Sequence, residues 1–244
     1  MDINVLKRIA YLVISIILIL TLFENVRNKI AGDFLFPIVH NLGVNTHSAG
    51  IQLASGKILQ YIGDYDQAEK VYTHIINDKN LSKQKKALER SYQFLGDALY
   101  KKGDYTNAVK AYFYALKKNP ANRPALLKFV RINMAYNNTD QVFPVIYSYI
   151  DENKKDYTGY SELCGAYNRV GDYQMARIHC QLAIKSNRND ARSHYDLAVA
   201  YYHIGFKDEA KEEYTLAKKI RPGIKSREEL ESTLIEFKKQ QAQK

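Results

Sequence analysis

The stretch Glu89–Asn122 reads ERSYQFLGDALYKKGDYTNAVKAYFYALKKNPAN, and its pattern decides the fold of the chain. The same 34-residue pattern returns without a gap at Arg123, Tyr157 and Ala191. An earlier copy begins at Ala49 and is separated from the others by six extra residues. A fixed period of this length indicates stacked helical pairs, in which each pair buries its apolar face against its neighbours.

Within each copy, apolar and small residues recur at helical spacing on both sides of a turn. In the copy that begins at Glu89, the marker positions are Tyr92, Leu95, Gly96, Leu99, Gly103, Ala108, Tyr112, Ala115 and Pro120. These residues resemble the tetratricopeptide repeat (TPR) at nearly every marker, and the copies from Ala49, Tyr157 and Ala191 keep most of them. The resemblance implies an all-α, right-handed solenoid of antiparallel helix pairs.

The turn between the two helices of a pair has its own signature. Gly103-Asp104-Tyr105 recurs as Gly63-Asp64-Tyr65 and as Gly171-Asp172-Tyr173. Glycine tolerates the positive φ that ends the first helix, and the aspartate side chain can cap the second helix. Small residues at Gly96, Ala108 and Ala115 are expected to let the paired helices approach closely.

The copy at 123–156 is degenerate. Val130 and Val142 replace small residues, Asn137 replaces the turn glycine, and Pro144 falls early in the second helix. A proline there removes a helical hydrogen bond unless it lies in the first turn. We favour a drifted repeat that still stacks, and the alternative is a change in superhelix curvature that shapes a site.

The amino terminus differs from the repeats. Ile9–Phe23 has no charged residue and follows Lys7-Arg8, and with Ile3–Leu6 it reaches the length of a membrane-spanning helix. The rival interpretation is a cleaved secretory signal, but no small-residue cleavage site follows. The flanking charges lean slightly toward a cytosolic amino terminus. We therefore expect a single-pass membrane protein with an extracytoplasmic, periplasmic repeat domain; the inverted topology would make it a cytoplasmic platform.

The expected organisation has eight parts. They are an N-terminal membrane anchor at 1–24, a linker or capping segment at 25–48, repeats at 49–82, 89–122, 123–156 (degenerate), 157–190 and 191–224, and a C-terminal capping helix at 225–244. The linker is expected to cap the first repeat because Phe34–Val39 is too apolar for a free segment. Ser226 and Glu229 have capping-box spacing ahead of the last apolar residues.

Composition and motif searches give little sign of chemistry. The chain carries a formal net charge of +10, spread along its helices, which favours acidic partners. The histidines lack zinc-site spacing and the glycines stand singly, so we expect no enzyme activity, no metal and no cofactor. Cys164 and Cys180 are the only cysteines. They are read first as small core residues, with an intra-repeat disulfide as the alternative.

The TPR resemblance implies a concave groove lined by the first helices of each pair. The expected groove residues are Lys57, Gln60, Arg90, Gln93, Asp97, Tyr100, Arg131, Asn168, Arg169, Arg192, Tyr195 and Tyr202. These side chains suit an extended peptide, because amides bond its backbone and arginines its carboxylates. The family's best-known clamp for an acidic carboxyl-terminal tail uses set residue types at fixed repeat positions, and this chain does not reproduce it. The ninth residues of the five copies are Lys57, Asp97, Arg131, Gly165 and Val199.

The sequence therefore predicts a membrane-anchored scaffold or adaptor that binds a protein or peptide partner, acidic or with a free carboxylate. Its role could lie in envelope assembly, secretion or chaperoning. The alternatives are a nucleic-acid-binding helical repeat, for which the charge is diffuse, and a secreted repeat protein whose N-terminal segment is cleaved.

Overall fold

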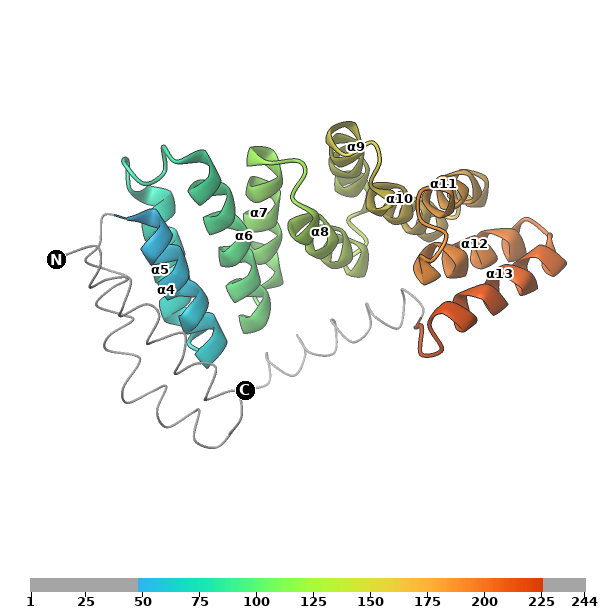
Figure 1. The fold of residues 1–244 in the computed structure, drawn as a ribbon, viewed down its shortest axis with the longest axis horizontal. Helices are drawn as coiled ribbons and strands as arrows, with labels where there is room; N and C mark the ends of the chain where they lie inside the picture. Colours follow the sequence, from blue (N-terminus) through green and yellow to red (C-terminus); the bar gives the residue numbers. More distant parts are fainter. Residues whose placement is uncertain (1–47, 226–244) are drawn as a thin grey trace. The chain divides into compact units, whose positions relative to one another are not determined.

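The computed structural model describes residues 48–225, which form ten α-helices and no strand. The helices are α4 (Ala49–Ile62), α5 (Tyr65–Asn77), α6 (Lys85–Lys102), α7 (Tyr105–Lys118), α8 (Arg123–Ala135), α9 (Val142–Glu152), α10 (Tyr157–Val170), α11 (Tyr173–Ser186), α12 (Ala191–His203) and α13 (Lys207–Ile220) (Figure 1). A 3-10 turn, η2 (Thr139–Gln141), precedes α9. The all-α expectation is confirmed for this part of the chain.

Several expectations fall outside the described residues. They are the membrane anchor at 1–24, nearly all of the linker at 25–48, and the C-terminal capping helix from residue 226 on. Between residues 48 and 225, none of the helices combines the length and the apolar character that crossing a membrane requires.

The helices belong to two compact units, one ending at Lys102 and the other beginning at Gly103. In the first unit α4, α5 and α6 pack against one another. Its core contains Leu59, Tyr72 and Ile75, all at 0% exposure, with Phe94 of α6 packed against them. In the second unit α10, α11 and α12 pack together, as do α12 and α13.

The turns confirm the roles expected from the Gly-Asp-Tyr signature. The turn glycines at Gly63, Gly103 and Gly171 have φ between 80° and 88°, where a side chain would be strained. The aspartate that follows each glycine caps the next helix: Asp64, for example, accepts a hydrogen bond from the backbone N–H of Gln67 at 3.0 Å. Three of the copies therefore share the same turn, a left-handed glycine followed by an aspartate that caps the next helix.

The degenerate copy keeps the left-handed turn residue but has no side-chain cap on its second helix. Asn137 takes the left-handed conformation at φ 57°, which asparagine tolerates better than most residues. Pro144 lies in the first turn of α9, where no intrahelical hydrogen bond is lost. Because α8 and α9 both contact α10, this copy packs on its successor as a drifted repeat would.

The residues at two repeat positions set the distance between the two helices of a copy. Counted from the first residue of each copy, these are positions 8 and 24. Gly56 and Tyr72 occupy them in the first copy, where a Cβ on Gly56 would lie 2.5 Å from the Tyr72 ring. Cys164 and Cys180 occupy them in the copy from Tyr157. There the two Cα atoms are 5.0 Å apart and the structure joins the cysteines in a disulfide, in place of the two free thiols that the sequence favoured.

Candidate partner-binding surfaces

In the first unit, the predicted groove residues divide into exposed and bonded ones. Lys57 and Arg90 are exposed, and the Lys57 Nζ lies 4.9 Å from the centroid of the Phe94 ring. Gln60 is held at both ends: its Nε2 donates to the Phe94 carbonyl at 2.8 Å, and its Oε1 accepts from the Tyr72 hydroxyl. Three further predicted residues on α6 are half-buried, namely Gln93, Asp97 and Tyr100.

In the second unit, three of the six predicted groove residues donate hydrogen bonds to backbone carbonyls outside their own repeat. Asn168 Nδ2 donates to the Asp196 carbonyl at 2.7 Å, which ties α10 to α12. Arg169 donates to the Met134 carbonyl and to Asn137 Oδ1, at 3.3 and 3.1 Å. Arg192 Nη1 donates to the Lys225 carbonyl at 2.6 Å. Arg131 is half-buried on α8.

Gln60 and Asn168 occupy the same place, position 12 of their copies. Each amide donates to the backbone carbonyl at position 6 of the next copy, Phe94 or Asp196. Amide bonds at the same repeat positions therefore hold consecutive first helices together in both units. These two residues stabilise the stack, which leaves them poorly suited to bind a partner as the sequence predicted.

Tyr195 and Tyr202, also predicted, line a hollow of about 380 Å³ between α12 and α13. Its other walls include Tyr214 and the lysines Lys207 and Lys211. Tyr202 is 63% exposed, so its ring is available for contact. The hollow combines aromatic walls with two cations.

A larger hollow of about 830 Å³ lies between α11 and α13, on a different stripe of α12 from the one that carries Tyr195 and Tyr202. We call it the α11–α13 pocket. Its lining residues are Gln181, Ile184, Lys185, Arg188, Asn189, His194, Leu197, Tyr201, Glu213, Leu216, Lys219 and Ile220. Most of them come from second helices and their turns, so the prediction of a first-helix groove missed this pocket.

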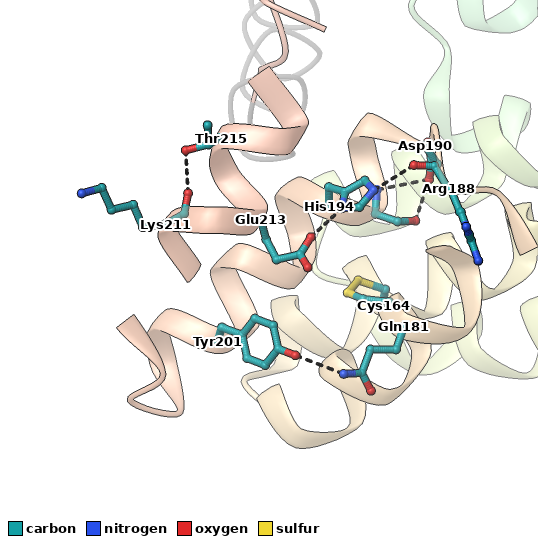
Figure 2. A network of polar contacts seen from close by, with 11 residues as sticks. Cys164, Gln181, Arg188, Asp190, His194, Tyr201, Lys211, Glu213 and Thr215 are labelled. Atoms are coloured by element: carbon teal, nitrogen blue, oxygen red, sulfur yellow. Dashed lines mark hydrogen bonds and ion pairs between the residues drawn. A yellow bond between two sulfur atoms is a disulfide. The ribbon is translucent and has the colours of Figure 1, made fainter. Parts of the chain in front are cut away.

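Figure 2 shows His194 in the wall of the α11–α13 pocket, between Glu213 and Arg188. Its Nδ1 contacts the Glu213 Oε2 at 2.5 Å, and its Nε2 contacts the Arg188 carbonyl at 3.0 Å. Both partners accept hydrogen bonds, so the imidazole is stabilised with a proton on each nitrogen. The hydrogen bond to Glu213 raises the pKa of His194 above its ordinary value, and burial opposes it. His194 therefore forms an ion pair between α12 and α13.

Thirty-four residues earlier, the equivalent place is filled by aromatic rings. Tyr147, Tyr160 and Tyr167 surround the buried His179, with the Tyr167 and His179 rings stacked at 5.2 Å. The Tyr147 and Tyr167 hydroxyls are 2.8 Å apart. Burial lowers the pKa of His179, so its ring is neutral near pH 7. This cluster packs the junction between α9 and α11.

The described residues offer no sign of a catalytic or metal centre. Between 48 and 225, no cluster of three or more His, Cys, Asp or Glu side chains could hold a metal ion. Both cysteines are joined to each other, and His194 is paired with a carboxylate of the neighbouring helix.

The repeated helix pairs and their caps define an all-α helical-repeat protein. Two sequence models of the tetratricopeptide repeat match, one over residues 85–128 and one over 191–224, so these two segments of the chain are tetratricopeptide repeats. No curated protein matches it.

Solved structures of tetratricopeptide repeat proteins share the fold. MamA 41-end from Desulfovibrio magneticus RS-1 is 18% identical and has a TM-score of 0.57, covering 74% of this chain and 99% of its own. The MamA RS-1 ArsTM double mutant is 16% identical with a TM-score of 0.59, covering 72% and 96%. YrrB, described as a TPR protein with an unusual peptide-binding site, is 15% identical with a TM-score of 0.56, covering 73% and 89%. At these identities the likeness concerns the fold alone.

Proposed function

We propose that this protein is a membrane-anchored scaffold whose repeats form a right-handed solenoid and hold a peptide segment of a partner protein along their first helices. The observation that carries the proposal is the repeated amide bond at position 12. It fixes neighbouring first helices and leaves the cations Lys57 and Arg90 exposed, with the Lys57 Nζ over the Phe94 ring. A surface whose own residues are already fixed loses little entropy when it binds.

The chemistry of this surface favours a partner segment that is acidic or ends in a free carboxylate. Lysine and arginine attract carboxylates, and arginine can bind them with two parallel hydrogen bonds. The half-buried Phe94 offers an apolar contact beside Lys57. The net charge of +10 attracts an acidic partner over a longer range.

The proposed location is the outer side of a membrane, with residues 1–24 as the anchor. The Cys164–Cys180 disulfide supports this placement, because disulfides persist in oxidising compartments and are rare in the cytosol. A reporter that is active only outside the cytoplasm, fused after Lys244, tests the topology. Activity is expected, and activity only of a cytoplasmic reporter at the same junction would invert the assignment.

The binding proposal is tested with fluorescent acidic peptides that carry either a free or an amidated carboxyl terminus. In the full chain, Lys57→Glu with Arg90→Glu should weaken binding about tenfold, since two exposed charge contacts become repulsive. The matched control, Lys70→Glu with Lys79→Glu, makes the same charge change at exposed sites away from the first helices. Equal weakening by both pairs would reduce the effect to net charge and contradict a first-helix site.

Arg192 is a poor choice for this test, although the sequence placed it in the groove. Its reversal would also remove the hydrogen bond to the Lys225 carbonyl.

Nucleic acid is the competing class of ligand. Tighter binding of single-stranded RNA than of the peptides, with a steep salt dependence, would favour that class instead.

A further inference from the structure

The α11–α13 pocket is emptier than the equivalent junction one repeat earlier, which lies between α9 and α11. In the counterpart, Tyr147 and Tyr160 pack against the His179 ring. The equivalent residues in the pocket are Gln181, His194 and Glu213. Their side chains have a smaller total volume, and each forms a hydrogen bond. Gln181 donates to the Tyr201 hydroxyl at 3.1 Å, and His194 pairs with Glu213 (Figure 2). The rings that would fill the junction are absent, and a hollow of about 830 Å³ remains.

The pocket also differs in charge. Lys185 stands where the earlier repeat has Asp151, and it is joined by Arg188 and Lys219 in the lining, all three exposed. The one carboxylate of the lining, that of Glu213, is compensated by His194. The pocket therefore presents three cations without a free counter-charge among its lining residues. Two of these three positions also hold lysine at the earlier junction, Lys154 and Lys185, so the difference in charge between the two junctions is Lys185 in place of Asp151.

Beneath the cations the surface is apolar. Leu197 forms a buried floor at 2% exposure, beside the half-buried Ile184. Leu216 and Ile220 are 42% and 38% exposed, which is unusual for two large aliphatic side chains lining one hollow. Water in this hollow contacts mostly apolar walls, so an apolar side chain that displaces it gains free energy.

We propose that the α11–α13 pocket is a second binding site, which takes an acidic segment of a partner protein with one or two large apolar side chains. The apolar side chains occupy the space above Leu197, and the flanking carboxylates pair with Lys185, Arg188 and Lys219. The site is independent of the first-helix surface, because its lining includes none of the residues that carry the groove proposal. A scaffold with both sites can hold two partner segments at once.

A protein segment fits the pocket better than a nucleic acid does. Single-stranded nucleic acid binds through aromatic rings on which bases stack, in addition to cations. Tyr201 and His194 are the aromatic residues of the lining, and both are held within the protein: the Tyr201 hydroxyl accepts a hydrogen bond from Gln181, and His194 pairs with Glu213. Aliphatic walls with flanking cations match leucine or phenylalanine beside glutamate or aspartate.

The experiment uses a synthetic 12-residue peptide that alternates glutamate with a photoreactive leucine analogue. After irradiation with the full-length protein, mass spectrometry maps the cross-linked residues. Cross-links on α11 and α13 are expected, and they separate this site from the first helices even if both bind the peptide. Two control peptides replace either every glutamate with glutamine or every leucine analogue with alanine, and each should lose most of the binding.

Paired variants assign the binding to the pocket. Lys185→Glu with Lys219→Glu should weaken the peptide about tenfold. Lys117→Glu with Lys118→Glu is the matched control: Lys117 has the same repeat position as Lys185, and both control lysines are exposed. For the apolar contact, Leu216→Ser should weaken binding, whereas Leu182→Ser, 38% exposed and outside the pocket, should not.

Three results would overturn the proposal. The first is unchanged affinity in both pocket variants, or cross-links confined to other helices. The second is an oligonucleotide that displaces the peptide and is weakened equally by Lys185→Glu with Lys219→Glu, which would make the pocket a phosphate site. The third concerns the chain's own tail. If exchanging Glu228, Glu229, Glu231 and Glu236 for glutamine in the full chain raises peptide affinity tenfold or more, the tail is the occupant.

Discussion

The close approach of α4 and α5 depends on a single missing side chain, and replacing Gly56 with alanine tests it. A Cβ at this position would lie 2.5, 2.6 and 2.9 Å from Cε1, Cζ and the hydroxyl oxygen of Tyr72. The Tyr72 ring is fully buried and its hydroxyl donates to Gln60, so it cannot simply swing away. Overpacking of this kind costs about 1–3 kcal/mol.

Gly50→Ala supplies the matched control in the same helix. A Cβ there meets nothing nearer than the Ser48 Oγ at 3.8 Å, an ordinary contact. Alanine in place of glycine also raises helix propensity, by up to about 1 kcal/mol inside the helix at Gly56 and by less at Gly50 in the first turn. This gain opposes the packing cost of about 1–3 kcal/mol at Gly56, so Gly56→Ala should be less stable than Gly50→Ala by up to about 2 kcal/mol.

The assay is urea unfolding of the full-length protein followed by far-ultraviolet circular dichroism. Gly50→Ala is expected to match or exceed the wild type, and Gly56→Ala to unfold at lower urea. Equal midpoints for the two alanine variants would refute the packing of Gly56 against Tyr72, and with it the pairing of repeat positions 8 and 24.

Three further predictions concern other parts of the chain. Cys164→Ala with Cys180→Ala should lower the free energy of unfolding by about 3 kcal/mol, the chain-entropy value for a loop of this length, in chemical denaturation; two free thiols in the native, unreduced wild type would contradict the bond. Because the hydrogen bond to Glu213 raises the folded-state pKa of His194, its stabilisation is complete below the unfolded pKa near 6.5 and is lost as pH rises through the folded pKa; melting temperatures of His194→Gln should show a flatter pH profile, and an unchanged slope would oppose this origin. Ala108→Leu, at a fully buried position, should destabilise by about 1–3 kcal/mol, and unchanged melting would argue against the repeat register.

Local structure could be predicted from the sequence because it rests on short-range chemistry. The turn at Gly103-Asp104 needs only a glycine at positive φ and an aspartate that reaches the N–H three residues on. The same holds for Pro144, whose place in the first turn follows from where α9 begins. These features depend on neighbours in the chain, and the left-handed turn residue survives even in the degenerate copy, as Asn137.

The binding surfaces were less predictable, because they depend on which long-range contacts a side chain makes. Asn168 and Arg169 have the chemistry of groove residues, yet their polar groups bond to backbone carbonyls of adjacent repeats. The α11–α13 pocket arises because residues such as Gln181 take the place of aromatic residues such as Tyr147. Comparing equivalent positions 34 residues apart reveals that exchange in the sequence, whereas the resulting hollow depends on the packing of all three helices.

The disulfide was partly predictable from the sequence. The register placed Cys164 and Cys180 at positions 8 and 24, on the two helices of one pair. The structure brings their Cα atoms to 5.0 Å, inside the range of roughly 4.4–6.8 Å that disulfides span. Gly56 and Tyr72 at the same positions of another copy are the sequence signal that these positions meet.

Site-specific photo-cross-linking in the cells that make the protein tests the scaffold account most directly. A photoreactive amino acid at Arg90 on the first helix α6, compared with one at the exposed Lys117 on the second helix α7, reports which surface a partner contacts. The account predicts a discrete cross-linked protein at Arg90, with an acidic or carboxyl-terminal peptide at the junction, and none at Lys117. Equal products at both positions, or none at Arg90, would contradict binding along the first helices.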